Sequence, residues 1–423
     1  MASRVRTVCG LCALLLFSSL IPPVVAEGAV ELEDPIWIAE HDLGLEALAA
    51  GGETGQKVLI AGADGYARLL DGNNPNEQIE LAPPTNETIR AIDWHPRGKT
   101  ALMAGDSGTM LRYVSEDHSV TTVTGSVQLN NLNMAAVAWN AAGSNAYIGG
   151  EDGYIWAYHE GEGGQGVFQL LNDTKNSPIT DIACQPEKHL CAVTTQNDGV
   201  AIIDSNSNHE VFWIGGEDRI WRGINCDEPV MNRCIAIGDG RGIGMIGLNI
   251  QLPETSTVFT KLINTIGGEF THIHTRGTSE TLITMAPFQV MAWDLSDGEA
   301  YEWVEYGDVA NHSAELAGER LIGSWGTTDD SNLGFLVTSF GAIIEFHPPI
   351  ETSVWTDSLI SYVLGAVVFI AVPGSVLGLI FMNSETLQRK YYARRNAKFE
   401  AAENARIEKE KAEKRAARKA KDS

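Results

Sequence analysis

The chain has 423 residues, of which 44% are hydrophobic, and a formal net charge of −25 at pH 7. This length allows one large domain or several small ones, and the hydrophobic content excludes a chain that is mostly disordered. Binding to nucleic acid depends on Lys and Arg contacts with phosphate, so the acidic balance argues against a nucleic-acid partner.

The charge is divided between two regions. Residues 383–423 carry 13 Lys or Arg and 7 Asp or Glu, a net charge of +6. Residues 27–357 carry 15 basic and 48 acidic residues, a net charge of −33. We therefore expect the two regions to lie in different surroundings.

Residues 1–26 are typical of a secretory signal peptide. Arg4 and Arg6 precede an apolar run from Val8 to Leu20, and small residues at 24–26 offer a cleavage site. The run is shorter than the roughly 20 residues that span a bilayer, which favours cleavage over an uncleaved anchor helix. The predicted mature chain therefore begins at residue 27.

A unit of two apolar strands joined by an Asp/Gly turn repeats along residues 35–349. Five turn glycines are spaced by 43, 45, 46 and 43 residues: Gly65, Gly108, Gly153, Gly199 and Gly242. Two further copies are centred on Pro287 and Gly341. Each copy follows another short strand, and four strands in about 40–45 residues are typical of a β-propeller blade. The pattern predicts an all-β fold of seven blades over residues 27–350.

These repeats resemble the WD40/YVTN-type seven-bladed β-propeller superfamily. The segment from Ile92 to Tyr113 matches the family pattern most closely, and the blade-end Trp-Asp dipeptide survives at Trp293-Asp294. The resemblance implies ligand binding at the central mouth or at loops on the faces of the ring.

The last repeat leaves no room for an outer strand. It ends at residues 347–349, directly before the segment that leads to a second apolar run. We predict that the segment from Pro35 to Glu40 supplies the missing strand, which would remove two open sheet edges and fasten the ring.

Four cysteines remain after signal cleavage. Each of two pairs flanks one strand-to-strand turn, so we favour disulfides Cys184–Cys191 and Cys226–Cys234 among the three connectivities. A zinc site is a weaker alternative, since six and seven intervening residues are poor metal-ligand spacings. Four unpaired core cysteines are the remaining alternative.

Other chemistry-bearing residues favour structural roles. Turn aspartates recur once per blade and are interpreted as hairpin residues rather than calcium ligands: Asp64, Asp106, Asp152, Asp198 and Asp239. Trp94 and Trp139 occupy matching positions in their repeats, which indicates packing between blades rather than an aromatic ligand mouth. His272 and His274 alternate on one strand face. We find no catalytic, metal-binding or cofactor-binding motif and expect no cofactor.

Three N-x-[ST] sequons lie between strong strand patterns. They are predicted to be surface glycosylation acceptors: Asn86, Asn172 and Asn311.

The run Ser358–Met382 predicts a single transmembrane helix. It contains 25 residues without a charge and follows a juxtamembrane linker at residues 351–357. A buried core helix is the alternative. Gly374 and Gly378 form a small-residue spacing that would permit a homodimer.

The tail after the predicted span is basic and short. Its first part carries a cluster expected to contact anionic headgroups: Arg389, Lys390, Arg394, Arg395 and Lys398. By the positive-inside rule, residues 383–423 form a helical or disordered cytoplasmic tail and the propeller lies outside.

We interpret the chain as a cell-surface, membrane-anchored propeller that binds a protein or ligand without catalysis. An enzyme with its site at the central mouth (a hydrolase, a lyase or a quinone-dependent dehydrogenase) is the first alternative. An envelope protein assembly factor is the second alternative. The sequence identifies no partner.

Overall fold

The computed structural model describes residues 30–54, 56–161, 164–226, 232–276, 280–295, 297–313, 315–327, 333–348 and 377–419. The chain divides into two compact units, residues 1–350 and 351–423. The predicted signal peptide and most of the predicted span lie outside the described residues.

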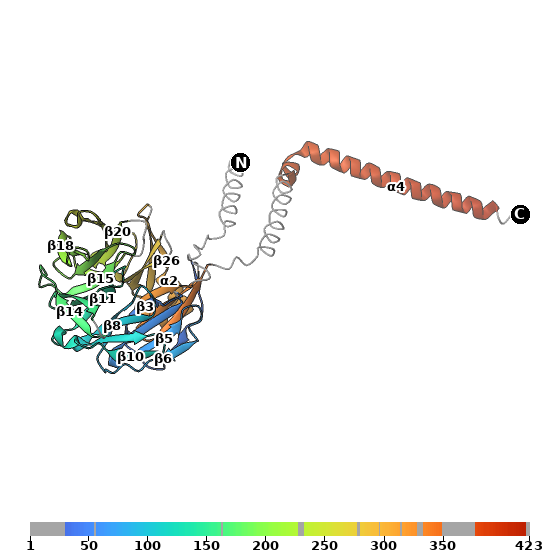
Figure 1. Ribbon diagram of the computed structural model, residues 1–423. Helices are drawn as coiled ribbons and strands as arrows, with labels where there is room; N and C mark the ends of the chain where they lie inside the picture. Colours follow the sequence, from blue (N-terminus) through green and yellow to red (C-terminus); the bar gives the residue numbers. More distant parts are fainter. Residues whose placement is uncertain are drawn as a thin grey trace. The chain divides into compact units, whose positions relative to one another are not determined.

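Seven antiparallel sheets build the first unit (Figure 1). Blade 1 contains β3 (Leu45–Gly51), β4 (Lys57–Gly62), β5 (Ala67–Asp71) and β6 (Gln78–Glu80). Blade 2 contains β7 (Ile89–Trp94), β8 (Thr100–Gly105), β9 (Met110–Val114) and β10 (Ser119–Thr122). Blade 3 contains β11 (Met134–Trp139), β12 (Ala146–Gly150), β13 (Ile155–Glu160) and β14 (Gly166–Leu170). Blade 4 contains β15 (Ile179–Cys184), β16 (Leu190–Thr195), β17 (Val200–Asp204) and β18 (Glu210–Gly215).

The remaining blades follow in chain order. Blade 5 contains β19 (Trp221–Asn225), β20 (Arg233–Gly238), β21 (Gly242–Gly247) and β22 (Thr257–Leu262). Blade 6 contains β23 (Glu269–Arg276), β24 (Glu280–Ala286), β25 (Gln289–Asp294) and β26 (Ala300–Val304). Blade 7 contains β27 (Leu321–Gly326), β28 (Gly334–Thr338) and β29 (Ala342–His347). Between blades 6 and 7 lie helix α2 (Tyr306–His312) and the 3-10 turn η6 (Leu316–Gly318).

The first strand of every blade packs against the first strands of both neighbouring blades. The contacts run from β3 through β7, β11, β15, β19 and β23 to β27, and β27 packs against β3 again. The ring is therefore closed, and the predicted seven-bladed propeller is confirmed.

The core lies between the blades. Strands in the middle of a blade are buried on both faces because each face packs against a neighbour. Trp221, Trp293 and Trp325 are among the largest fully buried side chains. Trp94 and Trp139 are also buried, with 7% and 6% of their surface exposed, which confirms their packing between blades.

The N-terminal segment closes the last blade, as predicted. Strands β1 (Glu31–Leu32) and β2 (Ile36–Trp37) both pair antiparallel with β29. Further backbone bonds join Glu33 to Glu345 at 2.9 Å and Ile38 to Gly341 at 3.0 Å. Blade 7 is thus completed by residues from the opposite end of the propeller sequence.

The two predicted disulfides are present. Cys184 is bonded to Cys191 and Cys226 to Cys234. Cys184 and Cys191 lie directly opposite each other on β15 and β16, so the bond joins adjacent strands of one sheet. This bonding rules out the zinc alternative and the unpaired alternative.

The turn glycines between the second and third strands are explained by close packing. Gly65 has φ +70, and a Cβ there would lie 2.1 Å from the carbonyl oxygen of Thr85. Gly153 has φ +76, and its Cβ would lie 2.2 Å from the carbonyl oxygen of Lys175. Thr85 and Lys175 belong to connections between successive blades. Glycine recurs because the turn and the connection touch there.

The prediction for the turn of blade 5 was wrong by one residue. Gly242 has an extended backbone with φ −81. The left-handed positions are Gly240, with φ 56, and Arg241, with φ 61. The Arg241 guanidinium donates a hydrogen bond to the carbonyl oxygen of Ile266 at 2.7 Å, a contact that a glycine could not make.

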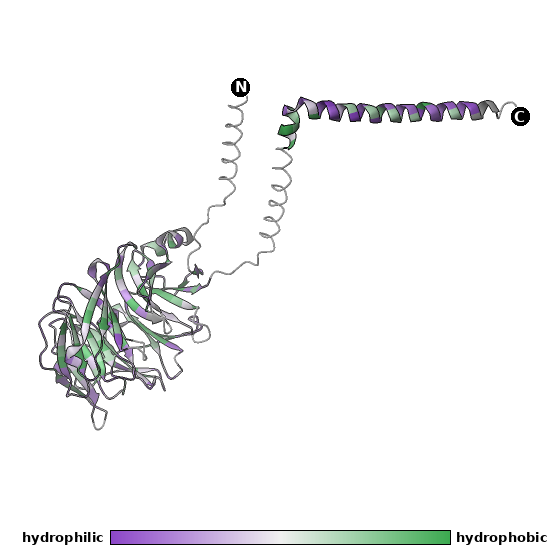
Figure 2. Ribbon diagram, turned by 90° about the horizontal axis from the view of Figure 1, so that it is seen from above, coloured by the Kyte–Doolittle hydropathy of each residue, from purple (hydrophilic) through white to green (hydrophobic). Residues whose placement is uncertain are grey.

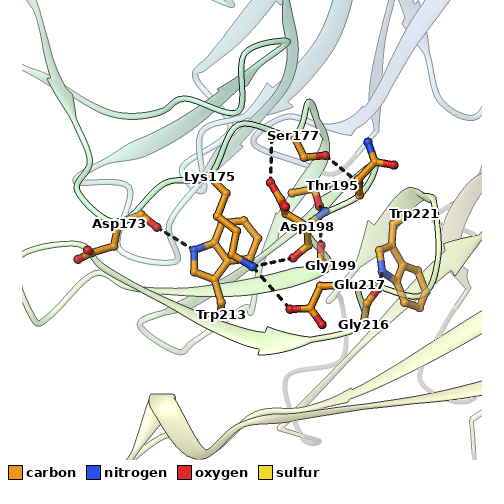
Figure 3. A network of polar contacts seen from close by, with 11 residues as sticks. Asp173, Lys175, Ser177, Thr195, Asp198, Gly199, Trp213, Gly216, Glu217 and Trp221 are labelled. Carbon is orange, nitrogen blue, oxygen red and sulfur yellow. Dashed lines mark hydrogen bonds and ion pairs between the residues drawn. The ribbon is translucent and has the colours of Figure 1, made fainter.

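The turn aspartates stabilise the turns in different ways: Asp106 pairs with the Arg90 guanidinium, whereas Asp198 holds backbone groups (Figure 3). Its carboxylate accepts a hydrogen bond from the Ser177 backbone N–H at 2.9 Å, and its own N–H donates to the Thr195 hydroxyl at 2.9 Å. The Lys175 ammonium lies 4.3 Å from the centre of the Trp213 ring in the same network. The interpretation of Asp198 as a turn residue is confirmed.

The second unit is described for residues 377–419. Residues 377–383 are helical, and helix α4 covers Glu385–Lys419. Figure 2 shows α4 as hydrophilic along most of its length. Ion pairs such as Glu410–Lys414, at 2.8 Å, join successive turns of the helix. Among the described residues, no helix is both long enough and apolar enough to cross a bilayer.

Candidate binding site at the central channel

The first strands of the blades surround a central hollow. Each of these strands carries a register shift near its start. Such bulges redirect side chains and increase twist, which suits strands that converge on an axis. A hollow of about 530 Å³ lies among the first strands of blades 1 to 6. We call it the channel hollow.

Polar side chains come from four of these blades. Small residues such as Ala49 and Ala138 form other parts of the lining. On the first strands these polar side chains are Asp93, Asp181, Asn225, His272 and His274, and Glu187 adds a carboxylate from the turn after the first strand of blade 4.

Two carboxylates link neighbouring blades. Asp93 of blade 2 accepts a hydrogen bond from the Trp139 backbone N–H of blade 3 at 2.6 Å. Asp181 of blade 4 accepts a hydrogen bond from the Ile224 backbone N–H of blade 5 at 2.9 Å. First strands present an open edge to the axis, and these carboxylates satisfy donors on that edge.

Burial shifts the protonation of the lining. It raises the pKa of Asp181 to about 7, although backbone N–H groups of Ile224 and Ile182 favour the carboxylate. Burial lowers the pKa of His272 to about 4, and the nearby His274 charge lowers it further. Burial alone lowers the pKa of His274 to about 4. Both imidazoles are therefore neutral at pH 7 and can donate and accept hydrogen bonds.

Three hollows meet on one face of the ring. We define the hairpin face by the turns after the first strands of blades 2 to 4, residues 95–99, 140–145 and 185–189. The channel hollow reaches this face at Pro96 and Glu187. A second hollow, of about 900 Å³, is lined by His95 and Ser144. A third, of about 400 Å³, shares Ser144 with the second hollow and Glu187 with the channel hollow.

Successive turns of the hairpin face interlock. The His95 side chain bonds the Gly143 carbonyl oxygen at 3.0 Å, which joins the turns of blades 2 and 3. A Cβ on Gly98 would lie 2.1 Å from the backbone of Gly52 in blade 1. The hairpin face is consequently a preformed surface.

The predicted modification sites lie apart from the channel hollow. Asn86 and Asn172 are exposed in connections between blades. Asn311 belongs to α2, and its side chain lies outside the described part of the structure. Glycosylation at the three sequons stays a prediction.

The predicted membrane-contact residues belong to the second unit. Gly374 lies outside the described residues, whereas Gly378 is helical with open space beside its Cα. The basic cluster is carried by α4 and is exposed: Arg389, Lys390, Arg394, Arg395 and Lys398.

One group of channel residues was singled out from the sequence, and the others were missed. The alternation of His272 and His274 placed both on one strand face, and the structure turns that face toward the axis. Asp93, Asp181 and Asn225 went unnoticed. Asp93 and Asn225 occupy the same position of the repeat, whereas Asp181 lies two positions earlier in its strand, so an alignment of the first strands groups only the first two.

The histidines predict an acid sensitivity of folding. The pKa of each imidazole is about 4 in the folded protein and 6.5 in the unfolded chain. As the pH falls from 6.5 to 4, the unfolded chain binds protons that the folded protein does not, so the free energy of unfolding decreases. Asp181 acts in the opposite direction, because its raised pKa favours the folded state at low pH. We expect the His272→Gln/His274→Gln variant to lose less stability than wild type between pH 6.5 and pH 4. The difference should be on the order of 2 kcal/mol per imidazole.

Urea unfolding at a series of pH values measures this difference. Comparing the double variant with wild type removes the effect of the many surface carboxylates, which both proteins share. Parallel stability curves for the two proteins would show that the imidazoles are not held neutral by burial.

Comparison with known proteins adds no family. No protein-family model matches the sequence, and no similar curated protein was found. The class of the protein is therefore given by its fold, a seven-bladed β-propeller. Within the described residues, no group of three or more His, Cys, Asp or Glu side chains is arranged to hold a metal ion.

Proposed function

We propose that this protein is a membrane-anchored, non-catalytic binding protein whose propeller engages its partner through the hairpin face. The run Ser358–Met382 serves as the anchor, the propeller lies outside the membrane and the basic tail lies in the cytoplasm. The observation that carries the proposal is the meeting of three hollows on this one interlocked face.

The polar groups of the channel hollow support a binding role. Asp93 and Asp181 already hold backbone donors of the adjacent blades, at 2.6 and 2.9 Å. Each carboxylate uses acceptor capacity on a backbone donor of the next blade, which favours a structural role. Their role is to fasten the ring around the channel hollow.

Charge reversal on the hairpin face tests the proposal. The full-length chain carries a tag, and partners are captured from membranes of the organism that makes it. Arg97 and Lys188 lie on the hairpin face, so Arg97→Glu/Lys188→Glu should abolish recovery of the specific partner. Arg222 is the second residue of β19, near the end of that strand opposite the hairpin face, so Arg222→Glu is the charge-reversal control and should retain the partner.

Two results would contradict the proposal. Equal partner recovery by both variants would show that the hairpin face is not the interface. Turnover by the purified protein in a panel of hydrolase, lyase and dehydrogenase substrates would show that the protein is an enzyme.

A further inference from the structure

A hollow beside the closing strands of blade 7 combines aromatic rings with carboxylates. It measures about 600 Å³, and its lining consists of Trp37, Ala39, Glu40, Glu315, Glu319 and Phe340. Phe340 lies in the turn between β28 and β29, which are the second and third strands of the blade. Turns of this kind lie on the face of the ring opposite to the hairpin face. We call this site the acidic aromatic hollow.

Backbone hydrogen bonds hold the segments of the lining together. The Ile38 N–H, next to Trp37, donates to the Gly341 carbonyl oxygen at 3.0 Å. The Ser339 N–H donates to the Arg320 carbonyl oxygen at 2.8 Å, which ties the segment after η6 to the same turn. The acidic aromatic hollow is therefore assembled before a ligand arrives, which lowers the cost of binding.

Two aromatic rings form a corner of the hollow. The ring centres of Trp37 and Phe340 are 5.7 Å apart, and the ring planes meet at 89°. Trp37 is the most exposed of the described tryptophans, with 39% of its surface open to solvent. The face of an aromatic ring carries partial negative charge, so exposed rings of this kind attract cations.

The charged side chains of the described lining are all carboxylates. Glu40, Glu315 and Glu319 contribute them, and the lining contains no Lys, Arg or His among the described residues. Arg320 follows Glu319 in the chain but pairs with Glu46 of blade 1 at 3.0 Å. The lining thus carries charge of one sign, which favours a cationic ligand.

The carboxyl group of Glu319 shows the effect of this charge. Burial raises its pKa and the negative charge of Asp42 raises it further, although the Phe340 backbone N–H and the Thr338 hydroxyl favour the carboxylate. A ligand cation beside Glu319 would offset both of the unfavourable effects.

A bare metal ion matches this lining poorly. Among the described residues, no group of three or more His, Cys, Asp or Glu side chains is arranged to hold one, so the three carboxylates do not converge on a point. The volume instead lies in the range of small-molecule sites. A quaternary ammonium ion spreads its charge over apolar methyl groups, so it can contact both rings while the carboxylates surround it.

We propose that the acidic aromatic hollow binds a quaternary ammonium ion, with its methyl groups against Trp37 and Phe340 and its charge balanced by the glutamates. This site lies on the other face of the ring from the hairpin face and is independent of the proposed partner interface.

Isothermal titration calorimetry of the full-length chain in a non-ionic maltoside detergent tests the site. The ligands are choline and its uncharged isostere 3,3-dimethylbutan-1-ol. Choline should bind roughly tenfold more tightly than the isostere, because choline alone carries a charge. Glycine betaine has the same cationic head but adds a carboxylate, so it should also bind more weakly than choline. A trimethyl-lysine peptide distinguishes a free small molecule from the same group on a protein, according to which binds more tightly.

Two kinds of variant assign the binding to this hollow. Trp37→Leu keeps an apolar side chain and removes the ring, so choline binding should weaken roughly fivefold or more, whereas Trp37→Phe should retain most of it. Glu40→Gln/Glu315→Gln should weaken binding by about fivefold. Glu210→Gln/Glu254→Gln removes two exposed carboxylates of blades 4 and 5, so it changes the net charge equally and should leave binding unchanged.

Three results would overturn the proposal: no binding of choline at millimolar concentration, equal binding of choline and the isostere, or equal weakening by the two carboxylate variants. Glu40 and Glu315 are exposed, so their variant keeps the test decisive if Trp37→Leu fails to fold. Partner capture through the hairpin face is measured separately, so failure of this site leaves the proposed function standing.

Discussion

Deleting residues 27–42 should lower the stability of the propeller by on the order of 5 kcal/mol, because blade 7 loses both closing strands. The deletion removes pairing of Ile36 and Trp37 with β29 and the backbone bonds made by Glu33 and Ile38. Several hydrogen bonds at about 1 kcal/mol each and the exposure of apolar side chains account for this size. A decrease of roughly 5–10 °C in melting temperature follows for a domain this large.

Calorimetry of the full-length and shortened chains measures the effect. A matched control removes residues 410–423 from the second unit, which contains no strand of the ring in its described part. That control should leave the propeller transition unchanged. An unchanged transition in the 27–42 deletion would mean that the ring is fastened elsewhere.

Removing both disulfides should destabilise the propeller by about 5 kcal/mol in total. The bonds close short loops, with sequence separations of 7 and 8 residues. Chain-entropy estimates give about 2.5 kcal/mol for loops of this length. The variants Cys184→Ala/Cys191→Ala and Cys226→Ala/Cys234→Ala should each show about half of the total.

Denaturant titration with and without reductant checks this expectation. Reduction of the wild-type protein should move the unfolding midpoint toward that of the fourfold alanine variant, and should not move the midpoint of the variant itself. If reduction leaves the wild-type midpoint in place, the disulfides do not stabilise the ring.

The fold was predictable because the propeller repeats one local pattern seven times. The spacing of Gly65, Gly108 and Gly153 reflects a packing demand of each turn, so the glycines report the period directly. Ring closure by the segment from Pro35 to Glu40 followed from a count of strands. The error at Gly242 arose because Arg241 adopts a left-handed backbone and holds it with a side-chain hydrogen bond, which a spacing pattern does not reveal.

The site was less predictable because it is assembled from several blades. Asp93 and Asp181 lie in blades 2 and 4, and their common role depends on backbone donors of the first strand in the next blade. The Trp94 indole nitrogen donates a hydrogen bond to the Ala49 carbonyl oxygen at 3.0 Å. The indole nitrogen of Trp139, at the matching position, has no such partner within the described residues. Such differences come from small shifts between blades of similar sequence.

Site-specific photocrosslinking on the intact cell is the most direct measurement of the central claim, that the hairpin face binds the partner. A benzophenone amino acid is placed at position 97 on the hairpin face and, as a control, at position 222 at the opposite mouth. The proposed function predicts a discrete crosslinked product from position 97 and none from position 222. A product from position 222 alone would contradict it.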